Sequence, residues 1–203
     1  LSVVKMLIKN FLITFCLNGS ITLNDLAVDG TIGLNTHGSG NATVVNDVGL
    51  QFAASSVGGD LHATSTTGNM TQSGGLDIEG TTTLITSADD ATITLGTTSN
   101  AFTGALLITT NDSGTDTAGD VSVHGGTTAL VIGDSTVDGD LTLTSTATGN
   151  AAVTDTGTLN IRGTTTVTAS GGDVTLNTAA NNFQGAVAID GVNVTAVITN
   201  DVD

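Results

Sequence analysis

The feature that most constrains the fold of this chain is an internal duplication, with a period of about 80 residues, that is long enough to hold several structural units. The segment Thr71–Thr83 (TQSGGLDIEGTTT) returns as Thr154–Thr166 (TDTGTLNIRGTTT), with two glycines, the apolar pair and the three closing threonines at the same positions. The two copies span about residues 58–137 and 138–203, and the second copy is truncated. A fixed period is typical of folds in which one structural unit stacks on the next.

Within each copy, apolar residues alternate with polar ones over short runs, and Gly, Asn or Asp closes each run. This alternation predicts short β-strands with one buried face, and no stretch has helical spacing. The runs are centred on six apolar pairs: Leu76/Ile78, Ile93/Leu95, Val121/Val123, Leu141/Leu143, Leu159/Ile161 and Val174/Leu176.

Many short strands in a repeating sequence predict an all-β solenoid of stacked coils rather than a sandwich or a barrel. If one copy holds four coils, each coil takes about 20 residues, and residues 20–203 form a rod of roughly nine coils. The 40 Thr and 27 Gly, with no Trp, Tyr or Pro, suit outward strand positions, tight bends and a narrow aliphatic interior. The sequence therefore predicts a parallel β-helix.

The charge balance excludes several partners. The net charge is −16, with 3 Lys and Arg against 19 Asp and Glu, so no basic surface is available to neutralise nucleic-acid phosphates or anionic lipids. Lys5 and Lys9 precede an apolar run at Phe11–Leu17, which is far shorter than the roughly 20 residues of a membrane span. Residues 1–19 resemble a secretory signal, and we expect the remainder, 20–203, to be an exported repeat domain. A hydrophobic first strand is the alternative interpretation of this segment.

The second copy contains the stretches GDLTLTS, GTLNIRGTTTVTA, GDVTLNTAANNFQGAV and the closing ITNDVD. In these stretches the chain resembles the β-strand repeats of filamentous-haemagglutinin-type adhesins and related giant bacterial surface proteins. The resemblance covers about residues 20–203. It implies a right-handed parallel β-helix at the bacterial cell surface.

The same resemblance implies an adhesive or stalk function, with a glycan or protein receptor on a host or neighbouring cell as partner. The alternative is a carbohydrate-active β-helix, a polysaccharide lyase or hydrolase, in which Asp138 and Asp140 would be the paired carboxylates. Trp and Tyr, the usual sugar-stacking residues, are missing, and the sequence has no GxSxG elbow and no phosphate-binding loop. We therefore expect no enzymatic activity and no organic cofactor.

One group of carboxylates is a candidate cation site. Asp134, Asp138 and Asp140 offer hard oxygen ligands at the short spacing that suits Ca²⁺. The corresponding residues of the first copy are Ala54, Gly58 and Asp60, so only one of the three carboxylates occurs twice.

Two further predictions concern bends and ends. Asn100 and Asn181, each two residues before a Phe, are expected to hydrogen-bond at bends or to stack between coils. Residues Asn200–Asp203 repeat the phrase that begins at Asn46, so the chain stops within the repeat pattern. An open coil exposes unpaired strand edges, which predicts end-to-end association or a continuation of the repeats.

Overall fold

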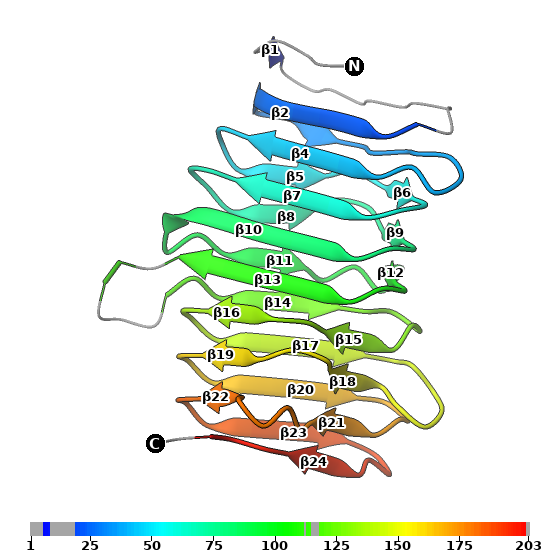
Figure 1. The fold of residues 1–203 in the computed structure, drawn as a ribbon, viewed down its shortest axis with the longest axis vertical. Coiled ribbons are helices and arrows are strands. Elements are labelled where there is room, and N and C mark those ends of the chain that lie inside the picture. Colours follow the sequence, from blue (N-terminus) through cyan, green and yellow to red (C-terminus); the bar gives the residue numbers. More distant parts are fainter. Residues whose placement is uncertain (1–5, 9–18, 112, 115–117, 202–203) are drawn as a thin grey trace.

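We analysed a computed structural model, which describes residues 6–8, 19–111, 113–114 and 118–201. These residues form twenty-four β-strands and no helix, and every strand pair is parallel. The chain winds as a solenoid whose coils stack along one axis (Figure 1). The predicted all-β, parallel β-helical fold is confirmed.

The strands form two broad layers and one narrow side sheet, named here from their positions in Figure 1. The front layer consists of β1 (Met6–Ile8), β2 (Ile21–Val28), β4 (Ala42–Asn46), β7 (Leu61–Ser65), β10 (Thr82–Asp89), β13 (Leu106–Asn111), β15 (Leu130–Ile132), β16 (Ser135–Val137), β18 (Val153–Asp155), β19 (Leu159–Ile161), β21 (Val174–Leu176), β22 (Asn182–Phe183) and β24 (Ala196–Ile198). The back layer consists of β3 (Thr31–Ile32), β5 (Leu50–Phe52), β8 (Met70–Gln72), β11 (Ile93–Leu95), β14 (Val121–His124), β17 (Leu141–Ser145), β20 (Thr165–Ala169) and β23 (Val187–Gly191). The side sheet consists of β6 (Ser55–Val57), β9 (Leu76–Ile78) and β12 (Ala101–Phe102).

The front strands run from right to left in Figure 1, and the chain then passes behind and downward, so the winding is right-handed. Each coil contributes one strand to the back layer, and the eight back strands correspond to about eight coils. Our expectation of nine coils assumed about 20 residues in every coil. The observed register shows that the coils differ in length, since Ala42 pairs with Leu61 but Ile93 pairs with Val121. Because some coils take more residues than we assumed, fewer coils fit.

Equivalent strands of the two structural repeats lie in opposite layers. The repeats are counted here from strand starts, as β4–β13 and β14–β23, and not from the sequence-copy boundaries at residues 58 and 138. The first repeat alternates single long strands in front (β4, β7, β10, β13) with pairs of short strands that return through the back and side sheets (β5 and β6, β8 and β9, β11 and β12). Each long strand or short pair is one pass of the chain across the solenoid, so the four long strands and three short pairs make seven passes. Because seven is odd, the next long strand, β14, lies in the back layer. From there the long strands β17, β20 and β23 lie behind and the short pairs lie in front.

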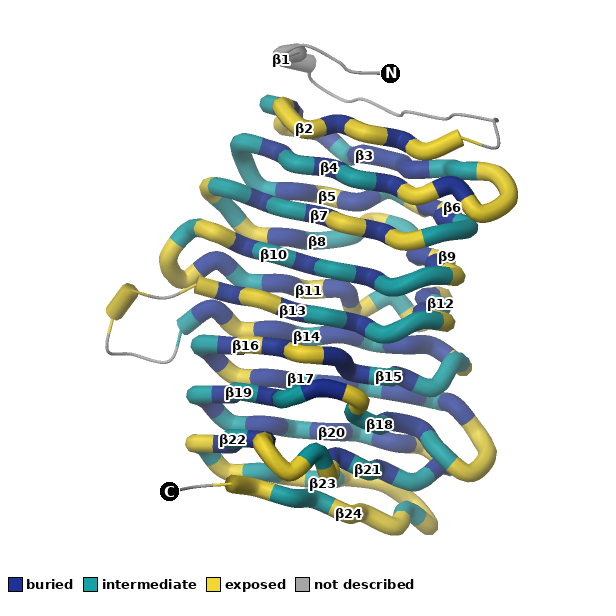
Figure 2. Tube along the Cα trace, in the orientation of Figure 1, coloured by how far each residue is buried: buried dark blue, intermediate teal, exposed yellow. Residues whose placement is uncertain are grey.

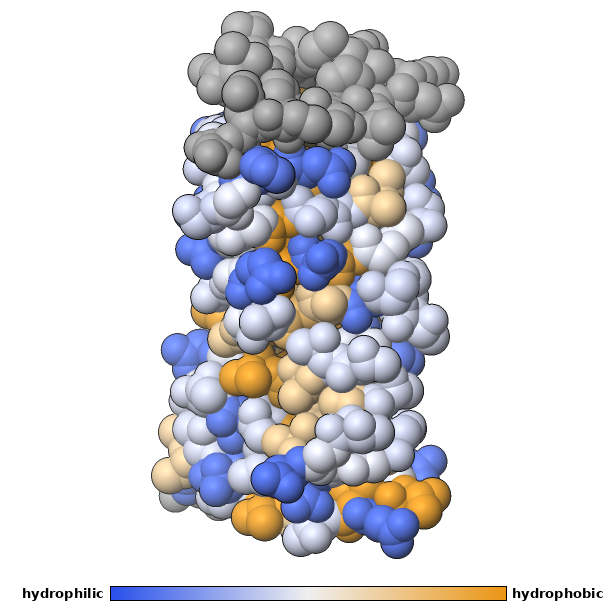
Figure 3. All heavy atoms as spheres, turned by 90° about the vertical axis from the view of Figure 1, so that its right-hand side faces the viewer, coloured by the Kyte–Doolittle hydropathy of each residue, from blue (hydrophilic) through white to orange (hydrophobic). Residues whose placement is uncertain are grey.

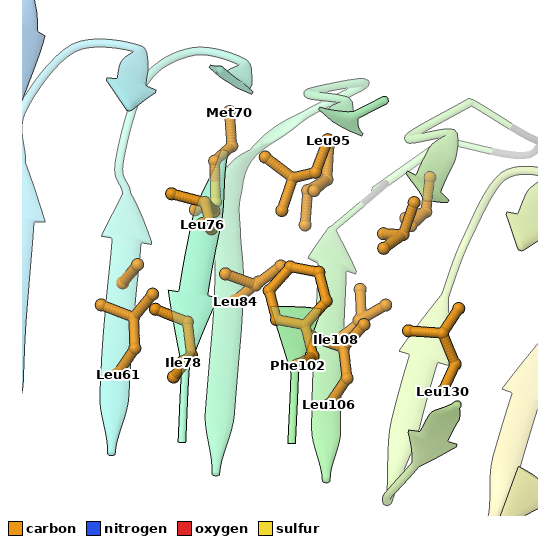
Figure 4. Close-up of a cluster of buried hydrophobic side chains, with 14 of the residues drawn as sticks. Leu61, Met70, Leu76, Ile78, Leu84, Leu95, Phe102, Leu106, Ile108 and Leu130 are labelled. Atoms are coloured by element: carbon orange, nitrogen blue, oxygen red, sulfur yellow. The ribbon is translucent and has the colours of Figure 1, made fainter. Parts of the chain in front are cut away.

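The interior is a narrow column of aliphatic side chains with a few phenylalanines (Figures 2 and 4). Residues in register stack along this column: Leu84 of β10 lies between Ala63 of β7 and Ile108 of β13. Phe102 is fully buried among Leu84, Leu106 and their neighbours (Figure 4). No coil could keep these side chains from water alone, so neighbouring coils stabilise each other.

The predicted signal-like segment, residues 1–19, lies for the most part outside the described residues. Within it, β1 pairs in parallel with β2, Met6 opposite Leu26. Among the described residues, no helix is long and apolar enough to cross a lipid bilayer.

Candidate functional site

The three aspartates of the candidate cation site lie in turns around β16, and each has a different partner. Asp134 Oδ1 accepts a hydrogen bond from the Thr158 amide (2.8 Å), and Asp140 Oδ1 accepts one from the Thr164 amide (2.6 Å). Asp138 instead forms an ion pair with Arg162, with 3.5 Å between Asp138 Oδ1 and Arg162 Nη1.

Asp140 belongs to a row of side chains that cap the turn of the following coil. Its own amide donates to Asp120 Oδ1 (2.8 Å), one coil earlier. In the first copy the equivalent residue, Asp60, likewise accepts the Thr81 amide through Oδ1 (2.8 Å). These carboxylates therefore hold one coil to the next, in keeping with the turn or stacking role that the recurrence of Asp60 and Asp140 in both copies indicates.

Across the described residues, no three His, Cys, Asp or Glu side chains converge in a way that could hold a metal ion. Oxygens of Asp134 and Asp140 are already used by backbone amides, and the charge of Asp138 is balanced by Arg162. Ca²⁺ binding at these residues stays a prediction.

Asp138 connects three coils, through its ion pair with Arg162 on one side and its backbone amide on the other. Arg162 follows β19, Asp138 follows β16, and the Asp138 amide donates to Thr110 Oγ1 of β13 (3.0 Å). The Arg162 and Asp138 side chains are 27% and 17% exposed, so solvent screens their interaction only in part. The single strong cation after Lys9 thus joins two successive coils of the second repeat.

Among the hollows lined by described residues are two with volumes of about 300 and 290 Å³. The second is lined by polar turn and strand side chains, among them Asn41, Asp60 and His62. Asp138 and Asp140, the carboxylates considered for glycoside cleavage, line neither of these two hollows.

Two buried asparagines, Asn100 and Asn181, hydrogen-bond to the backbone of neighbouring coils. Asn100, only 3% exposed, accepts the Leu76 amide through Oδ1 (2.9 Å) and donates through Nδ2 to the carbonyls of Leu95 (3.1 Å) and His124 (2.9 Å). Asn181, the equivalent residue of the second copy, accepts the Leu159 amide at 2.9 Å. Of the two roles expected for these asparagines, Asn100 bonds within its own bend through Leu95, and both asparagines hydrogen-bond to the backbone of a neighbouring coil rather than stacking on another asparagine.

One serine pair plays a similar part. Ser55 Oγ accepts the Leu34 amide (3.0 Å), and the equivalent Ser135 Oγ accepts the Ile108 amide (3.1 Å), each from the preceding coil. Our sequence reasoning missed these serines, although they occupy the same position in both copies and could have been found from that recurrence.

Comparison with known proteins identifies the repeat. A family model described as repeats of unknown function, DUF5649, matches residues 39–109 and residues 118–190, which together make up more than half of the chain. The first match starts just before β4 and ends within β13, and the second starts just before β14 and ends within β23, so each match covers four long strands and three short pairs. No curated protein and no solved structure matches the chain. Because both matches coincide with complete structural repeats, the chain belongs to the DUF5649 repeat family.

Proposed function

We propose that this chain is a spacer and presentation module of an exported bacterial surface protein, with an adhesive role toward host or neighbouring cells. The observation that supports it best is that the second repeat continues the axis of the first without enlarging the cross-section (Figure 1). One repeat of seven passes, or three and a half coils, adds on the order of 17 Å at about 4.8 Å per coil. Copy number would therefore set the length of the rod.

The surface suits an extracellular rod. A net charge of −16 makes copies of the chain repel one another, which favours solubility. With only 3 Lys and Arg among 203 residues, the chain offers few cleavage sites to trypsin-like proteases.

The flat outward faces give repeated polar positions to a receptor. In the back layer, Thr142 lies opposite Thr166 and Thr144 opposite Thr168, so hydroxyl and methyl groups recur at the coil spacing. A repeating glycan or an extended protein surface could contact several coils of such a face at once, and weak contacts would add up.

The spacer function is tested by displaying an epitope at the tip of rods with one, two and three repeats on a cell surface. We expect the height of the epitope, measured by fluorescence energy transfer to the membrane, to increase by about 17 Å per repeat. Heights that do not depend on repeat number would contradict the proposal.

The adhesive role is tested with beads that carry the purified chain, applied to epithelial and bacterial cells. A variant with Thr142, Thr144, Thr166 and Thr168 replaced by Ala provides the control, since these side chains point outward and the coils should still stack. We expect the beads to bind and the variant to bind less. Binding no greater than that of uncoated beads would rule out adhesion to the cells tested.

Export is tested by fusing residues 1–20 to a reporter enzyme that is active only outside the cytoplasm. The fusion should be active, and replacing Lys5 and Lys9 by Glu should abolish the activity, because export signals need a basic start. An inactive fusion would contradict the proposed export.

A further inference from the structure

We propose that the end face formed by β23 and β24 is a docking surface for a coil of another DUF5649 repeat, in the register in which β15 and β16 cover β13. The proposal concerns how repeats assemble and does not depend on the adhesive function. Five observations support it: the burial of β23, the strands that cover its equivalent, the resemblance of β24 to the first strand of a repeat, the alternation of layers, and the apolar character of the end face.

β23 is the repeat equivalent of β13 but lacks a cover. Leu106 and Ile108 of β13 are fully buried, whereas the equivalent Val187 and Ile189 are only partly buried. Both strands pair with the preceding coil at equivalent residues, so the difference arises on the other side (Figure 2).

The strands that cover β13 show what β23 lacks. β15 and β16 lie against β13, with Leu106 opposite Ile132 and Thr109 opposite Thr136. The Ile108 amide donates to Ser135 Oγ at 3.1 Å. β23 pairs with β20 in the same register as β13 pairs with β10, so Ile189 is the equivalent of Ile108. The Ile189 amide is therefore directed toward the open end, where a serine hydroxyl like that of Ser135 would accept its hydrogen bond.

β24 has the features of the first strand of a repeat. Ala196 to Asn200 (AVITN) matches Ala42 to Asn46 (ATVVN) in length and pattern. Asn46 binds the preceding coil by accepting the Val28 amide through Oδ1 (2.9 Å) and donating through Nδ2 to the Val28 carbonyl (3.1 Å). Asn200 makes the same pair of hydrogen bonds with Phe183, at 2.7 and 3.1 Å.

The layers agree with this assignment. The first repeat starts in the front layer with β4, and the second starts in the back layer with β14. An odd number of passes per repeat requires the third to start in front, and β24 does pair with β21 in the front layer.

The end face is apolar, as a surface that another coil covers should be. Val192 and Val197 are 73% and 47% exposed. Among the described residues, these two valines are the large apolar residues that are exposed to solvent. Figure 3 shows hydrophobic atoms gathered at the lower end of the rod, where the last coil lies, more densely than along most of the side in view. The fitting partner is a short strand pair of the β15–β16 kind, with apolar residues at alternate positions and a serine for the Ile189 amide.

The test replaces residues 201–203 with a copy of residues 47–111, so that Asn200 takes the place of Asn46. Amide hydrogen exchange is then measured at Ile189, with the unfused chain as reference. We expect exchange at Ile189 to slow at least tenfold in the fusion, and the melting temperature of the last coil to rise.

Two control fusions make the outcome decisive. Inserting one Gly after Asn200 turns every appended side chain to the wrong face, so Ile189 should exchange as in the unfused chain. Replacing the appended copy of Ser55 by Ala should reduce the protection of Ile189 more than that of the rest of β23. Equal exchange in the in-register and shifted fusions would overturn the proposal, as would an unfused chain that already buries Val192 in an end-to-end dimer.

Discussion

Replacing Asn100 by Ala should destabilise the solenoid more than any change of equal size at its surface. Asn100 is nearly fully buried and hydrogen-bonds to the backbone of three successive coils, at Leu76, Leu95 and His124. Ala cannot make any of these bonds, nor the two that the Asn100 side chain exchanges with the side chain of Gln72 (2.8 and 3.0 Å).

The magnitude follows from the backbone groups left without partners. One amide and two carbonyls lose the Asn100 side chain, and each unsatisfied buried group costs about 1–3 kcal/mol. Because His124 O is only partly buried and neighbouring losses are not additive, we expect the free energy of unfolding to fall by about 3–5 kcal/mol.

Urea denaturation followed by circular dichroism measures this loss, and Asn182→Ala provides the matched control. Asn182 is the same residue type on a neighbouring position of the second copy, but it is half-buried, and its side chain donates to Asn160 Oδ1 (3.1 Å) rather than to the backbone. We expect Asn182→Ala to cost about 0.5–1 kcal/mol. If Asn100→Ala cost no more than Asn182→Ala, the reasoning that buried asparagines hold the coils together would be refuted.

Three further predictions use the same denaturation assay. Thr82 Oγ1 is buried without a hydrogen-bond partner, so Thr82→Val should stabilise the chain by about 1 kcal/mol and Thr82→Ser should not; a loss in Thr82→Val would show that the hydroxyl does have a partner. A Cβ atom at Gly104 would overlap a carbonyl oxygen of the preceding coil, whereas one at Gly96 would meet nothing within 4 Å. Gly104→Ala should therefore cost at least about 2 kcal/mol and Gly96→Ala less than about 0.5 kcal/mol, and equal effects would contradict the coil spacing. Asp138→Asn removes the attraction to Arg162 and should cost about 1 kcal/mol or less, with a smaller effect in concentrated salt; a salt-independent loss would exclude an electrostatic cause.

Local sequence patterns predicted the strands and the winding. Each of the six alternating apolar pairs lies in a strand and faces the interior, from Leu76 and Ile78 in β9 to Val174 and Leu176 in β21. Alternation fixes which side chains point inward, and the duplication fixes that equivalent strands recur. The number of coils was less accessible because bends differ in length, as the long step between the register partners Ile93 and Val121 shows.

The placement of equivalent strands of the two repeats in opposite layers could not be predicted from the alternation. It depends on how many times the chain crosses the solenoid in one repeat. Two short strands such as β8 and β9 together make one crossing, and nothing in their local sequence distinguishes them from two strands that make one crossing each. The partners of Asn100 were also out of reach, because they come from residues 24 positions before and after it, a distance set by bend lengths. The aspartates suggested a cation site because their spacing along the chain is short, but coil stacking gives Asp134 and Asp140 different backbone partners.

The central claim is that the chain winds as stacked coils in which the second repeat starts on the layer opposite to the first. Cysteine cross-linking tests it directly in a Cys16→Ser background. Ser122 of β14 lies opposite Thr94 of β11 in the back layer, so Thr94→Cys with Ser122→Cys should form a disulfide on oxidation. If both repeats started on the same layer, Ser122 would instead lie beside Leu107 of β13, and Leu107→Cys with Ser122→Cys would cross-link. The account predicts a cross-link in the first pair and none in the second, and the reverse result would contradict it.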